Sequence, residues 1–221
     1  PTQFGGCVSL SGATLVGGAP QAGPPAQPGS GAAFVFMLRD GTWTLQAQLI
    51  GADTDRQDHF GQSVSVWGDT LAVGAHNDED GRGAAYVFTR SGSSWTQQAK
   101  LVAPDAAPND VFGTSLSVWG DTLVVGAPRA DVAAGADAGA VYVFERAGTA
   151  WAFVTKLTGS DAGVNDRFGN AVDLQRSTLV VGANLHGEPA GSYLGAAYVF
   201  ERGAAGWAEE AKLMPDALTQ G

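Results

Sequence analysis

The sequence is poor in cysteine, in basic residues and in long apolar runs, and each shortage argues against a class of protein. Cys7 is the only cysteine, so no disulfide can form within the chain and the fold must be held by packing and hydrogen bonds. The 12 Lys and Arg stand against 22 Asp and Glu, and the net charge of −10 opposes binding to nucleic acid. Nowhere do about 18 apolar residues run together, so we expect no membrane insertion.

Glycine is abundant instead, with 32 residues and no collagen period, as expected of many tight turns between short strands. The pair Phe-Gly recurs at Phe4, Phe60, Phe112 and Phe168. Each copy continues with an alternating apolar run, a tight turn, a second strand that ends in Gly-Ala, and a loop of variable length. A third strand rich in aromatic residues follows, and then a fourth that starts at Trp43, Trp95, Trp151 or Trp207.

Four short strands per repeat are the pattern of a β-propeller blade, and no segment has a sustained helical period. The repeats run approximately over residues 4–59, 60–111, 112–167 and 168–221 and form one domain over 1–221. We therefore predict an all-β fold, a β-propeller of four four-stranded antiparallel blades that close into a small ring. Two alternatives stay open: the chain supplies half of an eight-bladed homodimeric ring, or it is part of a longer propeller.

The repeats resemble the FG-GAP repeats of integrin α-chain propellers and of their bacterial relatives. The Phe-Gly pairs match the first half of the signature, and Gly18-Ala19-Pro20 and Gly126-Ala127-Pro128 match the second. The other copies vary it as Gly74-Ala75-His76 and Gly182-Ala183-Asn184. The resemblance implies an integrin-like recognition or cell adhesion module of a bacterial protein, and an extracellular or cell-surface location.

The sequence departs from this family at the connection between the first two strands, where many FG-GAP blades carry a calcium loop. Here the connection is a short hairpin turn with Asp69 or Asp121 as its carboxylate. Calcium needs about six or more oxygen ligands, which such a turn does not supply. We predict no calcium in these turns, no metal site and no cofactor, with calcium elsewhere as the alternative.

In FG-GAP blades, the loops from strand 2 to strand 3 and from strand 4 to the next strand 1 share one face, which binds ligand in integrins. The corresponding loops here vary while the strands stay constant, and variable loops on a constant scaffold usually carry binding. We predict a protein or glycan ligand at this face, unless the loops vary only because nothing constrains them. The predicted ligand-binding residues are His76, Asn77, Asp78, Glu79, Asp80, Arg82, Arg129, Asp131, Asn184, His186, Glu188 and Tyr193.

Two further sets of residues recur with the blades. An Asp pair precedes three of the Phe-Gly pairs: Asp53 with Asp58, Asp105 with Asp110, and Asp161 with Asp166. Asp at a turn usually accepts hydrogen bonds from backbone N–H groups, and we favour this interpretation over a cation site in each blade. The tryptophans that begin the fourth strands are expected to pack at the outer blade edge rather than to stack on sugars. Trp67 and Trp119 either form a contact surface or fold back over the blade.

No nucleophile elbow, phosphate loop or metalloprotease motif is present, and we predict that the protein is not an enzyme. The acidic residues repeat with the blade, whereas a catalytic site is normally asymmetric. The leading hypothesis is therefore a binding module. Its alternatives are a structural self-assembly unit that forms a larger ring, with a second copy as partner, and a metal-dependent binder.

Overall fold

The computed structural model describes residues 2–187 and 194–215, which form four antiparallel sheets of four strands each. Each sheet takes four consecutive strands in chain order and is called a blade. Blade 1 contains β1 (Val8–Ser11), β2 (Thr14–Ala19), β3 (Ala32–Arg39) and β4 (Thr42–Leu49). Blade 2 contains β5 (Ser63–Trp67), β6 (Thr70–Ala75), β7 (Ala84–Ser91) and β8 (Ser94–Leu101). Blade 3 contains β9 (Ser115–Trp119), β10 (Thr122–Ala127), β11 (Ala140–Ala147) and β12 (Ala150–Leu157). Blade 4 contains β13 (Phe168–Gln175), β14 (Thr178–Ala183), β15 (Ala196–Gly203) and β16 (Gly206–Leu213).

The first hairpin of each blade is closed by a turn that needs a positive φ. Blades 1 to 3 supply Gly12, Gly68 and Gly120, with φ of 57°, 57° and 61°. Blade 4 places Arg176 there, at a φ of 58°. Glycine adopts this conformation at little cost, which explains why glycine recurs at this turn position in three of the four copies.

The hydrophobic core lies in layers between neighbouring blades. Val16 and Val35 of blade 1, for example, pack with Phe60 and Val73 of blade 2. Equivalent layers join blade 2 to blade 3 and blade 3 to blade 4. Alternation along each strand therefore sends one set of apolar side chains to the preceding blade and the other set to the following blade.

The Phe-Gly pair is the joint between two blades. Phe60, Phe112 and Phe168 are buried, and each forms a parallel bridge to the glycine that precedes strand 3 of the preceding blade: Gly31↔Phe60, Gly83↔Phe112 and Gly139↔Phe168. The first half of the repeated motif therefore fixes how each blade sits on the one before it.

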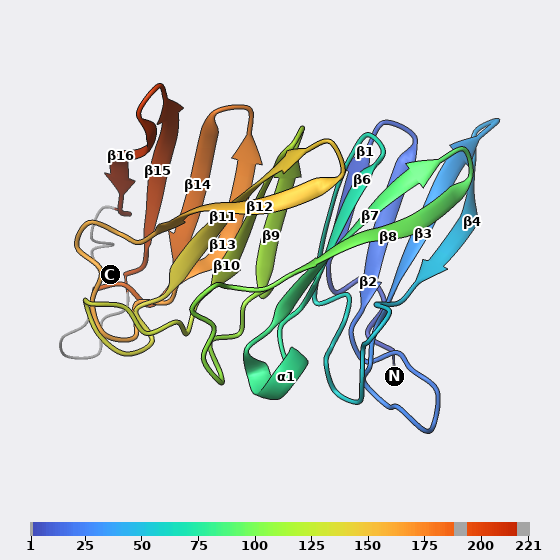
Figure 1. Cartoon of the computed structure of the whole chain (residues 1–221), viewed down its shortest axis with the longest axis horizontal. Helices are drawn as coiled ribbons and strands as arrows, with labels where there is room; N and C mark the ends of the chain where they lie inside the picture. The colour runs from blue at the N-terminus through green and yellow to red at the C-terminus, as the bar shows by residue number, and fades with distance from the viewer. Residues whose placement is uncertain (1, 188–193, 216–221) are drawn as a thin grey trace, which may run out of the picture.

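The blades stand in a row, with blade 1 and blade 4 at opposite ends of the molecule (Figure 1). The main packing joins β1 to β5, β5 to β9 and β9 to β13. The prediction of an all-β fold with four four-stranded antiparallel blades is confirmed. Closure into a small ring, which the sequence analysis favoured, is not seen in the described residues, because the outer faces of the first and last blades stay exposed.

The one helical segment among the described residues is α1 (Asp78–Gly81), between β6 and β7. It is a single irregular turn, because Glu79 and Asp80 have φ of 48° and 62°. No helix in the described ranges is long and apolar enough to cross a membrane.

Candidate functional site

The connections from strand 2 to strand 3 and from one blade to the next gather at one end of the sheets, where α1 is drawn (Figure 1). Hydrogen bonds hold these connections to one another. The side-chain amide of Asn77 donates to the backbone carbonyl of Gln57, and the backbone N–H of Asn109 donates to the backbone carbonyl of Asp80. We call this end the loop face. Its described residues are 20–31, 50–62, 76–83, 102–114, 128–139, 158–167, 184–187 and 194–195.

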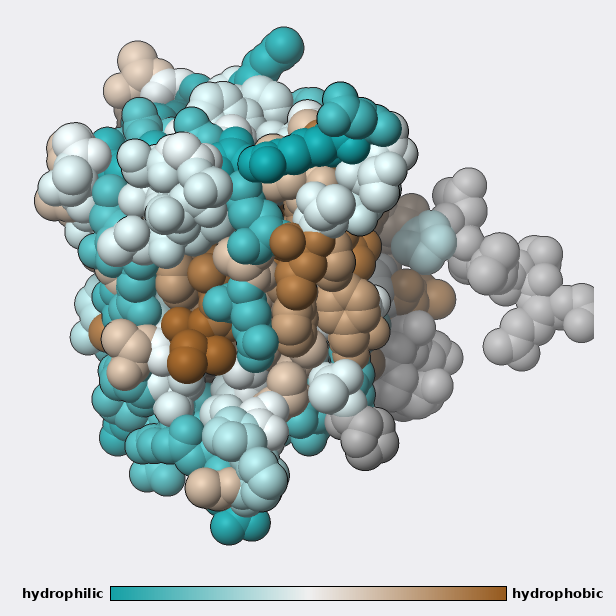
Figure 2. Space-filling model, turned by 90° about the vertical axis from the view of Figure 1, so that its right-hand side faces the viewer, coloured by the Kyte–Doolittle hydropathy of each residue, from teal (hydrophilic) through white to brown (hydrophobic). Residues whose placement is uncertain are grey.

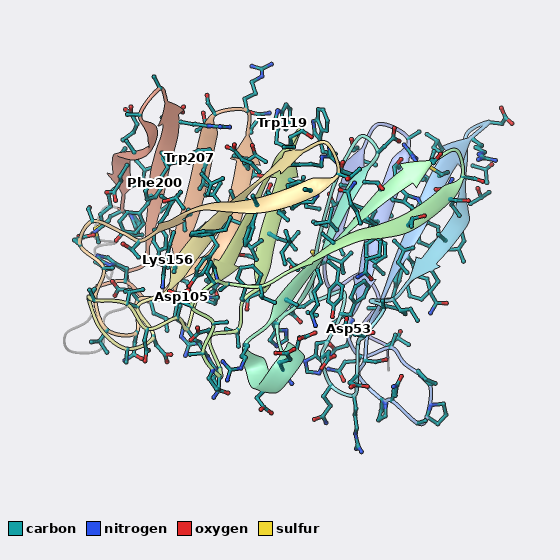
Figure 3. All side chains as sticks on the ribbon, viewed as in Figure 1. Asp53, Asp105, Trp119, Lys156, Phe200 and Trp207 are labelled. Atoms are coloured by element: carbon teal, nitrogen blue, oxygen red, sulfur yellow. The ribbon has the colours of Figure 1, made fainter. Side chains whose placement is uncertain are left out.

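A carboxylate from each connection between blades is held by a tyrosine and a lysine of the next blade. Tyr86 donates to Asp53 at 2.9 Å, Tyr142 to Asp105 at 2.8 Å and Tyr198 to Asp161 at 2.8 Å. Lys100, Lys156 and Lys212 donate to the same carboxylates at 2.8, 2.8 and 2.6 Å. We call each set an Asp–Tyr–Lys triad; Figure 3 shows Asp105 and Lys156 together near the loop face.

The electrostatics of the triads favour a structural role, in which the carboxylate is held in place, over proton transfer. The hydrogen bond from Lys212 keeps the pKa of the Asp161 carboxyl below its usual range. At Asp53 partial burial acts to raise the pKa, but the hydrogen bonds from Lys100 and Tyr86 outweigh it and the pKa is lowered. Burial raises the pKa of Tyr86 far above its ordinary value. These tyrosines therefore stay protonated and act as hydrogen-bond donors at neutral pH.

The second Asp of each pair has a different role. Asp58, Asp110 and Asp166 are buried, and each accepts a hydrogen bond from the backbone N–H three residues earlier, at 2.5, 2.8 and 2.7 Å. Burial raises the pKa of Asp58 and Asp110. The interpretation of these residues as hydrogen-bond acceptors at a turn is confirmed.

Among the predicted ligand-binding residues, those of α1 divide into two groups. Asp78 is buried and accepts from Tyr86 at 2.7 Å, while its other contact is Lys100 at 3.0 Å. Glu79 and Asp80 are exposed to solvent. They rim an open hollow of about 430 Å³ that the connection after blade 1 shares with α1. The exposed pair is therefore the part of α1 that is free to meet a ligand.

His76, Asn77 and Arg82 tie neighbouring loops together. His76 stacks on His59 with ring centroids 5.2 Å apart. Burial, helped by His59 and Arg129, lowers the pKa of His76 to about 4, so the ring is neutral at pH 7. Arg82 donates to the carbonyl of Ala106 at 2.7 Å.

The predicted residues of blades 3 and 4 are more scattered. Arg129 and Asp131 are exposed, and Asp131 accepts from the backbone N–H of Asp137 at 3.0 Å. Asn184 is exposed on blade 4, at the other end of the row from β1. Glu188 and Tyr193 lie outside the described residues. The structure thus brings residues 76–82 close to Arg129, while the blade 4 residues lie farther along the row.

His186 is buried in the triad of blade 4. Its Nδ1 lies 2.7 Å from a carboxylate oxygen of Asp166, and its Nε2 lies 2.6 Å from the Nζ of Lys212. An ammonium group only donates, so Nε2 accepts and the proton of a neutral ring lies on Nδ1. This network supports the loop from inside the fold, as Asp78 does in blade 2.

The triad partners are the residues that the sequence analysis missed. Tyr86, Tyr142 and Tyr198 occupy one position of the third strand, and Lys100, Lys156 and Lys212 occupy one position of the fourth. Blade 1 has Phe34 and Gln48 at these positions. Recurrence of the pair in three of the four copies is the signal that could have identified it.

The tryptophans at the start of strand 4 form a second set of joints, away from the loop face. The indole N–H of Trp95 donates to Gln46 of blade 1 at 2.9 Å, and that of Trp151 donates to Gln98 of blade 2 at 2.8 Å. Packing at the outer blade edge is confirmed for these two residues. Trp67 and Trp119 lie with ring centroids 5.9 Å apart, and Trp119 is at the end opposite the loop face (Figure 3).

Within residues 2–187 and 194–215, no three His, Cys, Asp or Glu side chains are grouped so that they could hold a metal ion. The absence of calcium and of a cofactor stays a prediction.

Four-stranded blades joined by Phe-Gly pairs define a β-propeller architecture. A family model described as the FG-GAP repeat matches residues 43–88, 95–144 and 151–200. These matches cover more than half of the chain, so the protein belongs to the FG-GAP repeat family and is an integrin-like β-propeller module. Each match runs from strand 4 of one blade through strand 3 of the next and thus spans one joint. A search of curated proteins finds no match to the chain.

Proposed function

We propose that this protein is a recognition or adhesion module, part of a secreted or cell-surface protein, that binds a protein or glycan through its loop face. One observation carries the proposal. The Asp–Tyr–Lys triads hold three successive connections at the same end of the blades, while the loops between strands 2 and 3 differ in length and charge. A constant frame that presents variable loops is the arrangement that binding proteins use.

The charge of the loop face favours a ligand with basic groups. Asp53, Asp58 and Asp78 are engaged in hydrogen bonds within the fold, whereas Glu79 and Asp80 are exposed beside the hollow. The whole chain carries a net charge of −10. A protein segment that carries Lys or Arg would meet an attractive field here, and an acidic partner would be repelled.

Catalysis is not part of this proposal. FG-GAP β-propellers are typically non-catalytic, and the triads recur from blade to blade rather than forming one asymmetric site. Their tyrosines are held protonated by burial, which removes the activated oxygen that a nucleophile or general base needs.

The test uses two matched variants. Asp80→Ser changes the loop face, and Asp40→Ser changes the turn between β3 and β4 at the opposite end; both residues are exposed and have a positive φ. The probes are an array of immobilised peptides that differ in net charge and an array of glycans. We expect Asp80→Ser to weaken binding of the retained probe by about 3- to 10-fold, and Asp40→Ser to leave it unchanged.

Circular dichroism should show the same fold for both variants. Equal binding by the two variants would remove α1 from the binding face. Weaker binding by Asp40→Ser alone would move the site to the opposite end of the blades.

A further inference from the structure

The two ends of the row of blades expose the surfaces that join blades inside the molecule. On blade 1, the side chains of Phe4, Val8 and Leu10 are 52%, 64% and 62% exposed. The equivalent Phe60, Val64 and Val66 of blade 2 are at most 5% exposed, because they pack on blade 1. Figure 2 shows apolar side chains gathered on this end of the molecule. We call this surface of blade 1 the head face.

Blade 4 exposes the opposite surface, which we call the tail face. Val180 and Leu213 are 39% and 56% exposed there. The equivalent Val124 and Leu157 of blade 3 are 0% and 8% exposed, because blade 4 covers them. The tail face therefore has the apolar composition of a surface that is buried at the internal joints, but no described residues cover it.

Glycine at position 182 is the sharpest sign that the tail face is built to receive a blade. A Cβ on Gly18, Gly74 or Gly126 would overlap the carbonyl oxygen of the Phe-Gly glycine of the next blade. A Cβ on Gly182 would meet only the side chain and backbone of Ala171, at 3.5 Å and beyond, in ordinary contact. Gly182 thus meets the requirement of a joint whose second half is not found among the described residues.

A hollow marks the place where the second half would sit. It has a volume of about 560 Å³, and its lining includes Gly182, Ala183, Gly195 and Ala196. The equivalent residues of blade 1, Gly18, Ala19, Gly31 and Ala32, lie against Phe60 and Gly61 of blade 2. The hollow is therefore the seat of a Phe-Gly pair, and Phe4-Gly5 is an exposed pair on this same chain.

Polar groups on the two faces also correspond. At the internal joints, the hydroxyls of Ser9, Ser65 and Ser117 accept from the backbone N–H of Val66, Val118 and Leu174 at 3.0 to 3.1 Å. Asp173 occupies the equivalent position on blade 4 and is exposed. Its carboxylate can accept from the N–H of Leu10, which is the equivalent donor on blade 1.

The outer edge offers a further pair. Trp95 and Trp151 donate to Gln46 and Gln98 of the preceding blade. Glu210 stands at the Gln position of blade 4, and Trp43, at the Trp position of blade 1, is 42% exposed. An incoming blade 1 would place the Trp43 N–H at a carboxylate acceptor.

We propose that the tail face of blade 4 binds the head face of blade 1 of a second copy of this chain. Two copies joined through both pairs of faces form a closed ring of eight blades, whereas a head-to-tail contact that did not close would continue as a filament. This inference goes beyond the recognition function and does not depend on it.

The contact between copies is weaker than an internal joint. Arg90 and Arg146 each donate a hydrogen bond to a threonine of the preceding blade, Thr14 and Thr70. Blade 1 has Leu38 at this position, which cannot donate. Phe34 and Gln48 replace the triad tyrosine and lysine. The head face thus retains the apolar contacts and loses part of the polar ones, so association is reversible and depends on concentration.

The first experiment measures mass by light scattering after size exclusion over a range of concentrations. We expect a shift from the 22.5 kDa monomer to a dimer of twice that mass as concentration rises. A chain that stays monomeric up to millimolar concentration overturns the proposal.

Two variants separate the faces. Gly182→Ala leaves the monomer folded and blocks the seat, and Leu10→Asp adds a charge to the exposed head face. We expect each to raise the dissociation constant by at least about 100-fold. The matched control is Gly126→Ala, whose Cβ overlaps Gly169 inside the molecule, so it lowers the urea midpoint of unfolding whereas Gly182→Ala does not.

A mixture of the two variants tests the head-to-tail arrangement. The tail face is intact in Leu10→Asp and the head face is intact in Gly182→Ala, so one joint is restored and a heterodimer appears on mixing. If either variant alone still dimerises like the parent chain, or if the mixture gives no heterodimer while the parent dimerises, the head-to-tail contact is wrong.

Discussion

His76 is the histidine whose pKa is most strongly altered by the fold. It lies half-buried between His59 and Arg129, and burial is the main reason that its pKa is lowered from 6.5 to about 4. Its Nδ1 has no hydrogen-bond partner in the described residues. A proton on this ring would therefore be buried near another histidine and a guanidinium group, without an acceptor at Nδ1.

The sign of the pH effect follows from the two states. Between pH 6.5 and about 4 the unfolded chain binds a proton at His76 and the folded chain does not, so the unfolding free energy falls as pH is lowered through this window. Above the window the contribution is constant. The loss from this residue is at most about 3.5 kcal/mol, because one pKa unit corresponds to about 1.4 kcal/mol.

His76→Asn provides the measurement, since blade 4 has Asn184 at the same position of its repeat. Urea unfolding of the parent and the variant is compared at neutral pH and near pH 4. We expect the difference in unfolding free energy between the two pH values to be smaller in the variant. An unchanged difference would show that another group, such as His59, whose pKa burial also lowers, causes the pH dependence.

At the residue scale, the sequence predicted local hydrogen bonds better than it predicted which polar side chains are buried. The turn position of Asp58, Asp110 and Asp166 predicted their backbone hydrogen bonds, because such bonds are local. The burial of Asp78 and His186 could not be predicted in this way. It depends on Tyr86 and Lys212, which reach them from separate strands.

At the scale of single elements, the joint between strand 4 of blade 3 and strand 4 of blade 4 lacks a hydrogen bond. Trp207 has a buried indole N–H without an acceptor in the described residues, and Val154 stands where Gln46 and Gln98 serve as acceptors. We expect Val154→Gln to raise the unfolding free energy by about 1 kcal/mol, the net value of an added hydrogen bond. Val154 is 46% exposed, and the aliphatic part of glutamine retains part of its apolar burial.

The control is the same substitution in a Trp207→Phe background, which has no indole N–H. Urea unfolding of the four chains gives a double-mutant cycle. A coupling near zero would mean that the introduced glutamine side chain does not reach the indole.

Strand positions were well predicted because four copies of one pattern could be compared. The predicted fourth strands that start at Trp43, Trp95, Trp151 and Trp207 lie within β4, β8, β12 and β16. The connection around α1 was less predictable. Glu79 and Asp80 have positive φ, and Asp80 accepts a hydrogen bond from the backbone N–H of Asn109 in a neighbouring loop, which the local sequence does not reveal.

At the scale of the whole molecule, the repeat predicted the blades and not the closure of the ring. Each blade has a head face and a tail face whatever the number of blades, so the same pattern suits a small ring, a larger ring or an open row. Closure depends on whether blade 1 and blade 4 meet. The exposure of Phe4 and Leu213 answers that question for this chain, and a single repeat contains no information about it.

We also predict that the whole module is independent of calcium. At the turns where related blades carry calcium loops, Asp69 and Asp121 form ion pairs with Arg90 and Arg146, at 2.6 Å. An arginine at the carboxylate opposes a second cation at the same oxygen. The remaining carboxylates of the described residues are not grouped as a metal site.

We therefore expect the same melting temperature in millimolar calcium and in chelator, with magnesium as the ionic control. A site filled to 100 times its dissociation constant would add about 2.7 kcal/mol to the unfolding free energy. For a chain of this size that corresponds to a rise of several degrees, well above the error of a thermal melt. Such a rise with calcium and not with magnesium would contradict the prediction. It would also place the metal outside the hairpin turns, because their carboxylates are already paired with arginine.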